Sequence, residues 1–160
     1  MSIVDKKQVK RRTWMMPQEV EVWYVLPALR RELAKIMKTK TVPRIGEDGK
    51  PKEHKITQKE IARMLGVTEP AITQYLLKKK GRRSRGDQVV IPEKFSPELD
   101  KSADTMIEHY EQGGSDDDMF ETMTREINRL IKVIRDDGAM CDIHRQFSAH
   151  VKDKCSACDR

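Results

Sequence analysis

The segment spanning residues 56–85, ITQKEIARMLGVTEPAITQYLLKKKGRRSR, constrains the fold more than any other part of this chain. Thr57 and Glu60 have the spacing of a capping box, which predicts that a helix begins at Thr57. Gly66 is expected to end that helix, because glycine enters the left-handed backbone region without steric cost. Thr68 is a good cap for a second helix. The segment therefore predicts two short helices joined by a tight turn.

Each predicted helix has an apolar side and a polar side. The apolar residues at helical spacing are Ile61, Met64 and Leu65 in the first helix, and Ile72, Leu76 and Leu77 in the second. An ordinary helical hairpin buried in a core is one interpretation, and a DNA-binding pair is the other. A dense run of positive charge after the second helix favours DNA, because a solvated face usually mixes both signs. This run consists of Lys78, Lys79, Lys80, Arg82, Arg83 and Arg85.

The pattern formed by Ala62, Gly66, Val67 and Ile72 resembles that of helix-turn-helix DNA-binding proteins, most closely the phage repressor and Cro type. The resemblance implies that the second helix enters the major groove of double-stranded DNA and contacts base edges with its first turns. Glutamine suits paired hydrogen bonds to adenine, and a threonine methyl group packs on a thymine methyl group. The implied base-contacting residues are Thr68, Glu69, Pro70, Thr73, Gln74 and Lys78.

Charge and composition restrict the class of protein. The chain has 160 residues, of which 36% are charged and 5% aromatic, a balance that suits a helical protein with a modest core. The formal net charge of +6 favours a polyanionic partner. No stretch approaches the roughly 20 apolar residues of a membrane span, and the N-terminus lacks the apolar core of a signal peptide. We therefore expect a cytoplasmic protein without a membrane partner.

Changes in composition divide the chain into four regions. Residues 1–16 are expected to form a flexible basic arm that follows a phosphate backbone, although a disordered solubilising end has the same composition. Residues 17–92 are expected to form the DNA-binding domain, with its helix-turn-helix core at residues 57–78. Residues 93–138 are expected to be a helical dimerisation region, and residues 139–160 a small Cys/His tail. The predicted fold class is mainly α.

The segment before the helix pair predicts a helix and a loop. Residues 17–38 have an amphipathic helical pattern, in which Pro27 is expected to break or kink the helix near Val25. Residues 39–55 are rich in proline, glycine and charge. Asp48-Gly49 is a turn signal within them, and it is compatible with a small hairpin.

The C-terminal half predicts two longer helices. Ser96-Pro97 is a good helix start, and this helix is expected to end at Gly113-Gly114. Ser115 is expected to cap the next helix, whose positive N-terminus suits the three aspartates that follow. An apolar stripe along that helix alternates steps of four and three residues, at Met123, Ile127, Leu130 and Ile134. The stripe either covers the core of a small bundle or pairs with its copy. Because operators of helix-turn-helix proteins commonly have two-fold symmetry, we expect a homodimer.

The tail CDIHRQFSAHVKDKCSACDR contains two pairs of potential metal ligands. Cys141 and His144 form the first pair, and Cys155 and Cys158 form the second. Four such ligands suit tetrahedral Zn²⁺, and an iron–sulfur cluster is the alternative, with His144 replacing a fourth cysteine. His150 is a spare candidate for the fourth ligand. A redox dithiol is less favoured, because no thioredoxin-like pattern precedes the second pair.

Two segments together resemble a family of predicted archaeal transcriptional regulators. These segments are WYVLPALRRELAK and QKEIARMLGVTEPAITQYL, which the family combines with paired Cys/His knuckles near the end of the chain. The resemblance covers residues 19–38 and 56–83 and, more loosely, the rest of the chain to residue 160. It implies a helix-turn-helix regulator with a metal-binding tail.

The predicted function is that of a sequence-specific DNA-binding transcriptional regulator. Residues 68–78 would contact bases in the major groove, and the cations of residues 78–85 would neutralise phosphates. One alternative makes the tail a redox or iron sensor that gates DNA binding. Another is a metal-bearing module that binds nucleic acid or protein without operator specificity. A hydrolytic enzyme is least favoured, because four ligands leave the metal no open position. We expect no enzymatic activity and no small-molecule substrate.

Overall fold

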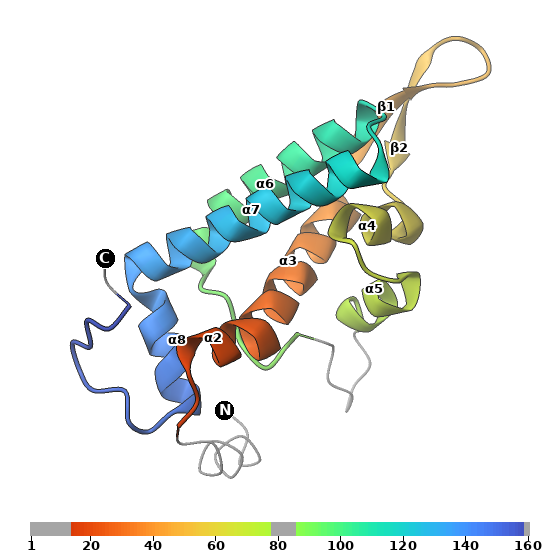
Figure 1. Ribbon diagram of the computed structural model, residues 1–160. Helices are drawn as coiled ribbons and strands as arrows, with labels where there is room; N and C mark the ends of the chain where they lie inside the picture. The colour runs from red at the N-terminus through yellow and green to blue at the C-terminus, as the bar shows by residue number, and fades with distance from the viewer. Residues whose placement is uncertain (1–13, 78–85, 159–160) are drawn as a thin grey trace.

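The computed structural model describes residues 14–77 and 86–158. The secondary structure in this part of the chain is mainly helical, with one two-stranded sheet, which confirms the prediction of a mainly α fold. Figure 1 shows two long helices side by side, α6 (Ser96–Glu111) and α7 (Asp116–Asp137), and α3 (Leu26–Thr39) packs against α6. None of the helices in the described ranges has the length and apolar content that a membrane crossing requires.

The first helical run passes through Pro27 without the predicted break. It consists of α2 (Pro17–Val20), the π-helical turn η1 (Glu21–Val25) and α3. The N–H of Leu26 donates to the carbonyl of Glu21, five residues back instead of four. Proline lacks an N–H, and its ring clashes with the carbonyl four residues earlier in a regular helix. The wider π turn just before Pro27 accommodates this conflict, so the run stays helical.

A β-hairpin connects α3 to the next helix. β1 (Thr41–Ile45) pairs antiparallel with β2 (Pro51–Lys55), so the turn signal at Asp48-Gly49 does mark a hairpin. Every residue of β2 is exposed, whereas Val42 of β1 is buried at the base. Figure 1 shows the hairpin projecting away from the helices.

The helices α6 and α7 form an antiparallel pair with a polar contact in its interior. The 3₁₀ turn η2 (Glu93–Phe95) leads into α6, so Ser96 is its first helical residue and not its cap. Between α6 and α7, the hydroxyl of Ser102 donates to the buried Glu126 carboxylate at 2.8 Å and accepts from Arg129 Nη2 at 2.6 Å. These bonds satisfy polar groups that would be costly to bury alone.

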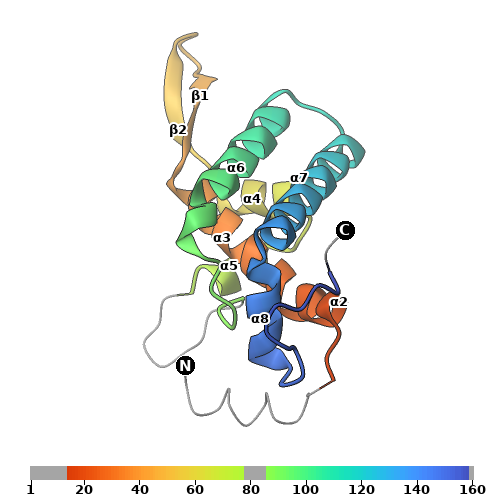
Figure 2. The same ribbon diagram turned by 90° about the vertical axis from the view of Figure 1, so that its left-hand side faces the viewer.

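The apolar stripe of α7 lies in the core of the chain itself. Ser115 caps this helix as predicted, because its hydroxyl accepts the N–H of Asp118 at 3.2 Å. Leu130 and Ile134 are each only 1% exposed. The helix packs on α6 and on α8 (Ala139–Phe147), and Figure 2 shows α8 beside α2, far from the hairpin. The first of the two interpretations of the stripe therefore describes this chain.

Candidate nucleic-acid interface

Two short helices with a tight turn occupy the predicted place. They are α4 (Gln58–Leu65) and α5 (Glu69–Tyr75). The hydroxyl of Thr57 accepts the N–H of Glu60 at 3.2 Å, and the N–H of Thr57 donates to the Glu60 carboxylate at 3.1 Å, which completes the capping box. Gly66 ends α4 in the left-handed region, with φ 64° and ψ 35°. The hydroxyl of Thr68 caps α5 by accepting the N–H of Ala71 at 3.3 Å. The predicted starts of both helices and the end of the first are confirmed. The second helix ends at Tyr75, so Leu76 and Leu77 follow it instead of lying on its apolar side as predicted.

The outer side of α5 carries the predicted base-contacting residues. Its inner side is buried through Ala71, Ile72 and Tyr75, and it packs on α3 and α4. At about 100° per residue, the exposed residues form two rows along the helix. The first row is Glu69 and Thr73, and the second is Pro70 and Gln74. The exposed candidates, including the cap, are Thr68, Glu69, Pro70, Thr73 and Gln74.

A contact between the two helices was not predicted from the sequence. The hydroxyl of Thr73 donates to the side-chain oxygen of Gln58 at 3.0 Å and lies 3.4 Å from the Glu69 carbonyl. Gln58 is the first residue of α4, so this bond places its amide beside the outer face of α5. Because the Gln58 oxygen faces Thr73, the amide nitrogen keeps two N–H donors for another acceptor. No sequence signal identifies Gln58, because the contact depends on how the helices cross.

Only some of the basic residues near the helix pair in the sequence belong to the described part of the chain. Lys78, Lys79, Lys80, Arg82, Arg83 and Arg85 all lie outside these residues. Within the described ranges, Lys55 and Lys59 are exposed at the start of α4. Lys55 is the last residue of β2, and Lys59 follows Gln58 in the first turn of α4.

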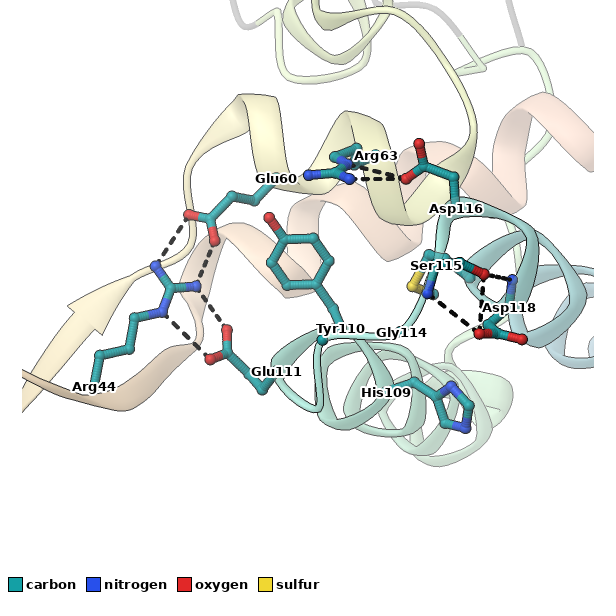
Figure 3. Close-up of a pocket in the computed structure, with 12 residues that line it drawn as sticks. Arg44, Glu60, Arg63, His109, Tyr110, Glu111, Gly114, Ser115, Asp116 and Asp118 are labelled. Carbon is teal, nitrogen blue, oxygen red and sulfur yellow. Dashed lines mark hydrogen bonds and ion pairs between the residues drawn. The ribbon is translucent and has the colours of Figure 1, made fainter.

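The hairpin, α4 and the end of α6 meet at a charged junction. Arg44 of β1 hydrogen-bonds to the carboxylate of Glu60 on α4 and donates to Glu111 Oε1 on α6 at 2.6 Å. Across a cavity of about 420 Å³, Arg63 of α4 donates to Asp116 Oδ1 at 2.9 Å. Figure 3 shows the Tyr110 ring between these two groups. The junction therefore ties the helix pair to both the hairpin and the α6–α7 connection.

Arg44 changes the protonation behaviour of its carboxylate partner. Partial burial alone would raise the pKa of Glu60, but hydrogen bonds from Arg44 and Thr57 outweigh burial and leave this pKa below its ordinary value. Hydrogen bonds to Glu111 and then to Glu60 raise the pKa of Arg44. Arg44 and Glu60 are therefore both charged near neutral pH.

Only some of the potential metal ligands in the tail lie close to one another. Cys141 and His144 are one turn apart on α8, and His144 Nε2 lies 2.6 Å from the Met15 carbonyl. The spare candidate His150 stacks on Trp14, with ring centroids 4.2 Å apart. Cys155 and Cys158 follow α8 in a segment without helix or strand. Within residues 14–77 and 86–158, no three His, Cys, Asp or Glu side chains gather as a metal site would require.

Comparison of the chain with protein-family models, with curated proteins and with solved structures finds no match. The resemblance to archaeal regulators stays a prediction, and the function has to be argued from the residues.

Proposed function

We propose that this protein is a sequence-specific DNA-binding regulator that inserts α5 into the major groove of double-stranded DNA. The observation that carries the proposal is the two-sided character of α5. Its apolar residues fix it to α3 and α4, while Glu69, Thr73 and Gln74 are exposed beside the Gln58 amide. A short helix held in this way presents its polar groups at fixed positions, as direct base contact requires. A helical hairpin buried in a core would not leave this face exposed.

The charge of the chain supports the same proposal. Lys55 and Lys59 are exposed on either side of Gln58 in the sequence, and the basic run at residues 78–85 follows α5 in the sequence. Cations at these places would neutralise phosphates on either side of the groove and supply the salt-dependent part of the affinity. Gln58 is a further candidate for a phosphate contact, because amide N–H groups commonly donate to phosphate oxygens.

We propose that the protein acts as a homodimer, because two copies of α5 would match the two halves of a symmetric operator. The stripe of α7 is used within the chain, so contact through residues 93–138 would involve the outer face of α7. Phe120 on that face is 64% exposed.

We also propose a metal site at Cys141, His144, Cys155 and Cys158, with zinc as the metal or, alternatively, an iron–sulfur cluster. The support is the contact between His144 and Met15. A metal-binding histidine commonly donates its second ring N–H to a backbone carbonyl, which leaves the other nitrogen as the ligand. With Nε2 donating to the Met15 carbonyl, Nδ1 of His144 is the nitrogen for a metal, one helical turn from Cys141. The second pair has to approach the first for the site to close.

Selection of duplexes from random DNA tests the regulator proposal. A regulator should select a defined motif with two-fold symmetry, and the selected duplex should bind far more tightly than shuffled DNA. A basic module without operator specificity would select no motif. Variants Lys79→Ala and Arg82→Ala should weaken binding to both duplexes and reduce the salt dependence, because phosphate contacts carry no sequence information.

A further inference from the structure

Some polar groups on the outer face of α5 form hydrogen bonds within the described part of the chain, and others do not. The hydroxyl of Thr68 accepts the N–H of Ala71, and the hydroxyl of Thr73 donates to Gln58. Within residues 14–77 and 86–158, no hydrogen bond or ion pair holds the carboxylate of Glu69 or the amide of Gln74. These two side chains therefore keep their full hydrogen-bonding capacity for a partner.

A carboxylate and an amide form hydrogen bonds with different bases. Ionised Glu69 only accepts hydrogen bonds, and the base donors in the major groove are the amino groups of cytosine and adenine. The amide of Gln74 both donates and accepts, and it matches the two groups of adenine. Because the Thr73 hydroxyl is directed to Gln58, this residue offers a base chiefly its methyl group, which suits the thymine methyl.

On this basis, and given the proposed DNA-binding function, we infer that α5 recognises a half-site in which Glu69 contacts a cytosine and Gln74 contacts an adenine. Five residues of helix span roughly 7.5 Å, and base pairs are spaced about 3.4 Å apart. The two contacted base pairs should therefore be about two steps apart. Thr73 is four residues, or roughly 6 Å, along the helix from Glu69. By the same measure its methyl group should meet a thymine about two steps from the cytosine, close to the level of the adenine.

The negative charge of Glu69 should also determine which DNA sequences the protein binds weakly. This negative charge is repelled by phosphates and by the acceptors of guanine and thymine, so a base pair that places an acceptor instead of an amino group opposite Glu69 is penalised. Glu69 should therefore lower the affinity for random DNA and raise discrimination. A side chain that only fills the interface would not have these two opposite effects.

Two substitutions of Glu69 separate these effects. Glu69→Gln should change the selected base from cytosine to adenine at one position, because an amide prefers adenine. Glu69→Ala should lose the preference there, by roughly 5- to 150-fold, and should bind random DNA more tightly than wild type. Glu108→Gln is the matched control, because Glu108 is an exposed carboxylate on α6, away from α5. It removes one charge and should leave the selected motif unchanged.

Two substitutions of Thr73 test the methyl contact. Thr73→Ser keeps the hydroxyl and removes the methyl, so the thymine preference should weaken. Thr73→Val keeps a methyl and removes the hydroxyl, so the preference should persist while the bond to Gln58 is lost. Thermal unfolding of each variant shows whether α5 is intact before DNA is added.

The outcomes distinguish this inference from the proposed function. A wild-type protein that selects no motif would overturn both. A wild-type motif that Glu69→Gln leaves unchanged at every position would overturn the inference alone, and so would weaker binding of Glu69→Ala to random DNA in a folded protein. A change from cytosine to adenine at a single position supports it.

Discussion

Arg135 of α7 and Glu21 of η1 form a two-point ion pair, with Nε and Nη2 donating to separate carboxylate oxygens at 2.7 Å each. Glu21 is 8% exposed, so its charge is nearly out of water. Replacing Arg135 with Met should cost about 1–3 kcal/mol of unfolding free energy, because the buried carboxylate of Glu21 would lose its partner. Urea titration measures this cost.

The double variant Glu21→Met with Arg135→Met is the control for the ion pair. Removing both charges should restore most of the loss, because an apolar pair avoids the cost of burying an unpaired ion. A double variant as unstable as Arg135→Met alone would show that Arg135 acts through packing instead.

Glu60 predicts a pH dependence of stability. Its pKa is lower in the folded protein than its ordinary value of 4.5. The ion pair with Arg44 therefore contributes its full stability when the pH is above the ordinary pKa of Glu60. This contribution is lost as the pH falls through the lowered pKa of the folded protein. Unfolding midpoints measured from pH 7 down to pH 3 should fall less steeply in Glu60→Gln than in wild type. Glu47→Gln, an exposed change on the hairpin loop, should follow the wild-type curve.

Gly66 is expected to resist substitution for two reasons. Its φ of +64° is unfavourable for residues with a side chain, and a Cβ atom would lie 3.3 Å from Met123 Cε. Gly66→Ala should lose about 1–2 kcal/mol of stability. Gly113→Ala is the comparison, because its φ is +77° but no atom lies within 4 Å of the added Cβ. Equal losses in both would mean that the contact with Met123 costs nothing.

The tail predicts a defined metal content. Protein purified without oxygen should contain about one zinc per chain, or iron with acid-labile sulfide if the site holds a cluster. Cys155→Ser and Cys158→Ser should each reduce the bound metal, and His150→Ala should not if His144 is the fourth ligand. Folded wild-type protein without metal, measured by elemental analysis, would remove the metal proposal and leave the DNA-binding proposal intact.

The features predicted correctly from the sequence are those that depend on near neighbours. Thr57 with Glu60 and Ser115 with Asp118 are pairs three residues apart, so the helix starts follow from local spacing. Gly66 ended α4 as predicted because its backbone preference is also local. At Pro27 the prediction of a break or kink near Val25 was wrong about the break, because a π turn that ends at Val25 keeps the run helical.

The features that the sequence did not predict depend on tertiary packing. Gln58 and Thr73 are 15 residues apart, Arg44 and Glu111 are 67 apart, and Glu21 and Arg135 are 114 apart. Each pair consists of common polar residues without a spacing rule, and only the crossing of the helices brings them together. The exposed face of α5 could be predicted from periodicity, whereas its engaged and unengaged groups could not.

Substitution of Gln74 shows whether α5 contacts bases. Fluorescence anisotropy should measure the affinity of wild type, Gln74→Ala and the exposed control Gln112→Ala for the selected duplex and for a shuffled one. Gln74→Ala should lose about 1–3 kcal/mol of binding free energy on the selected duplex only. The control should match wild type on both. Equal loss on the two duplexes, or equal wild-type affinity for them, would contradict base recognition by α5.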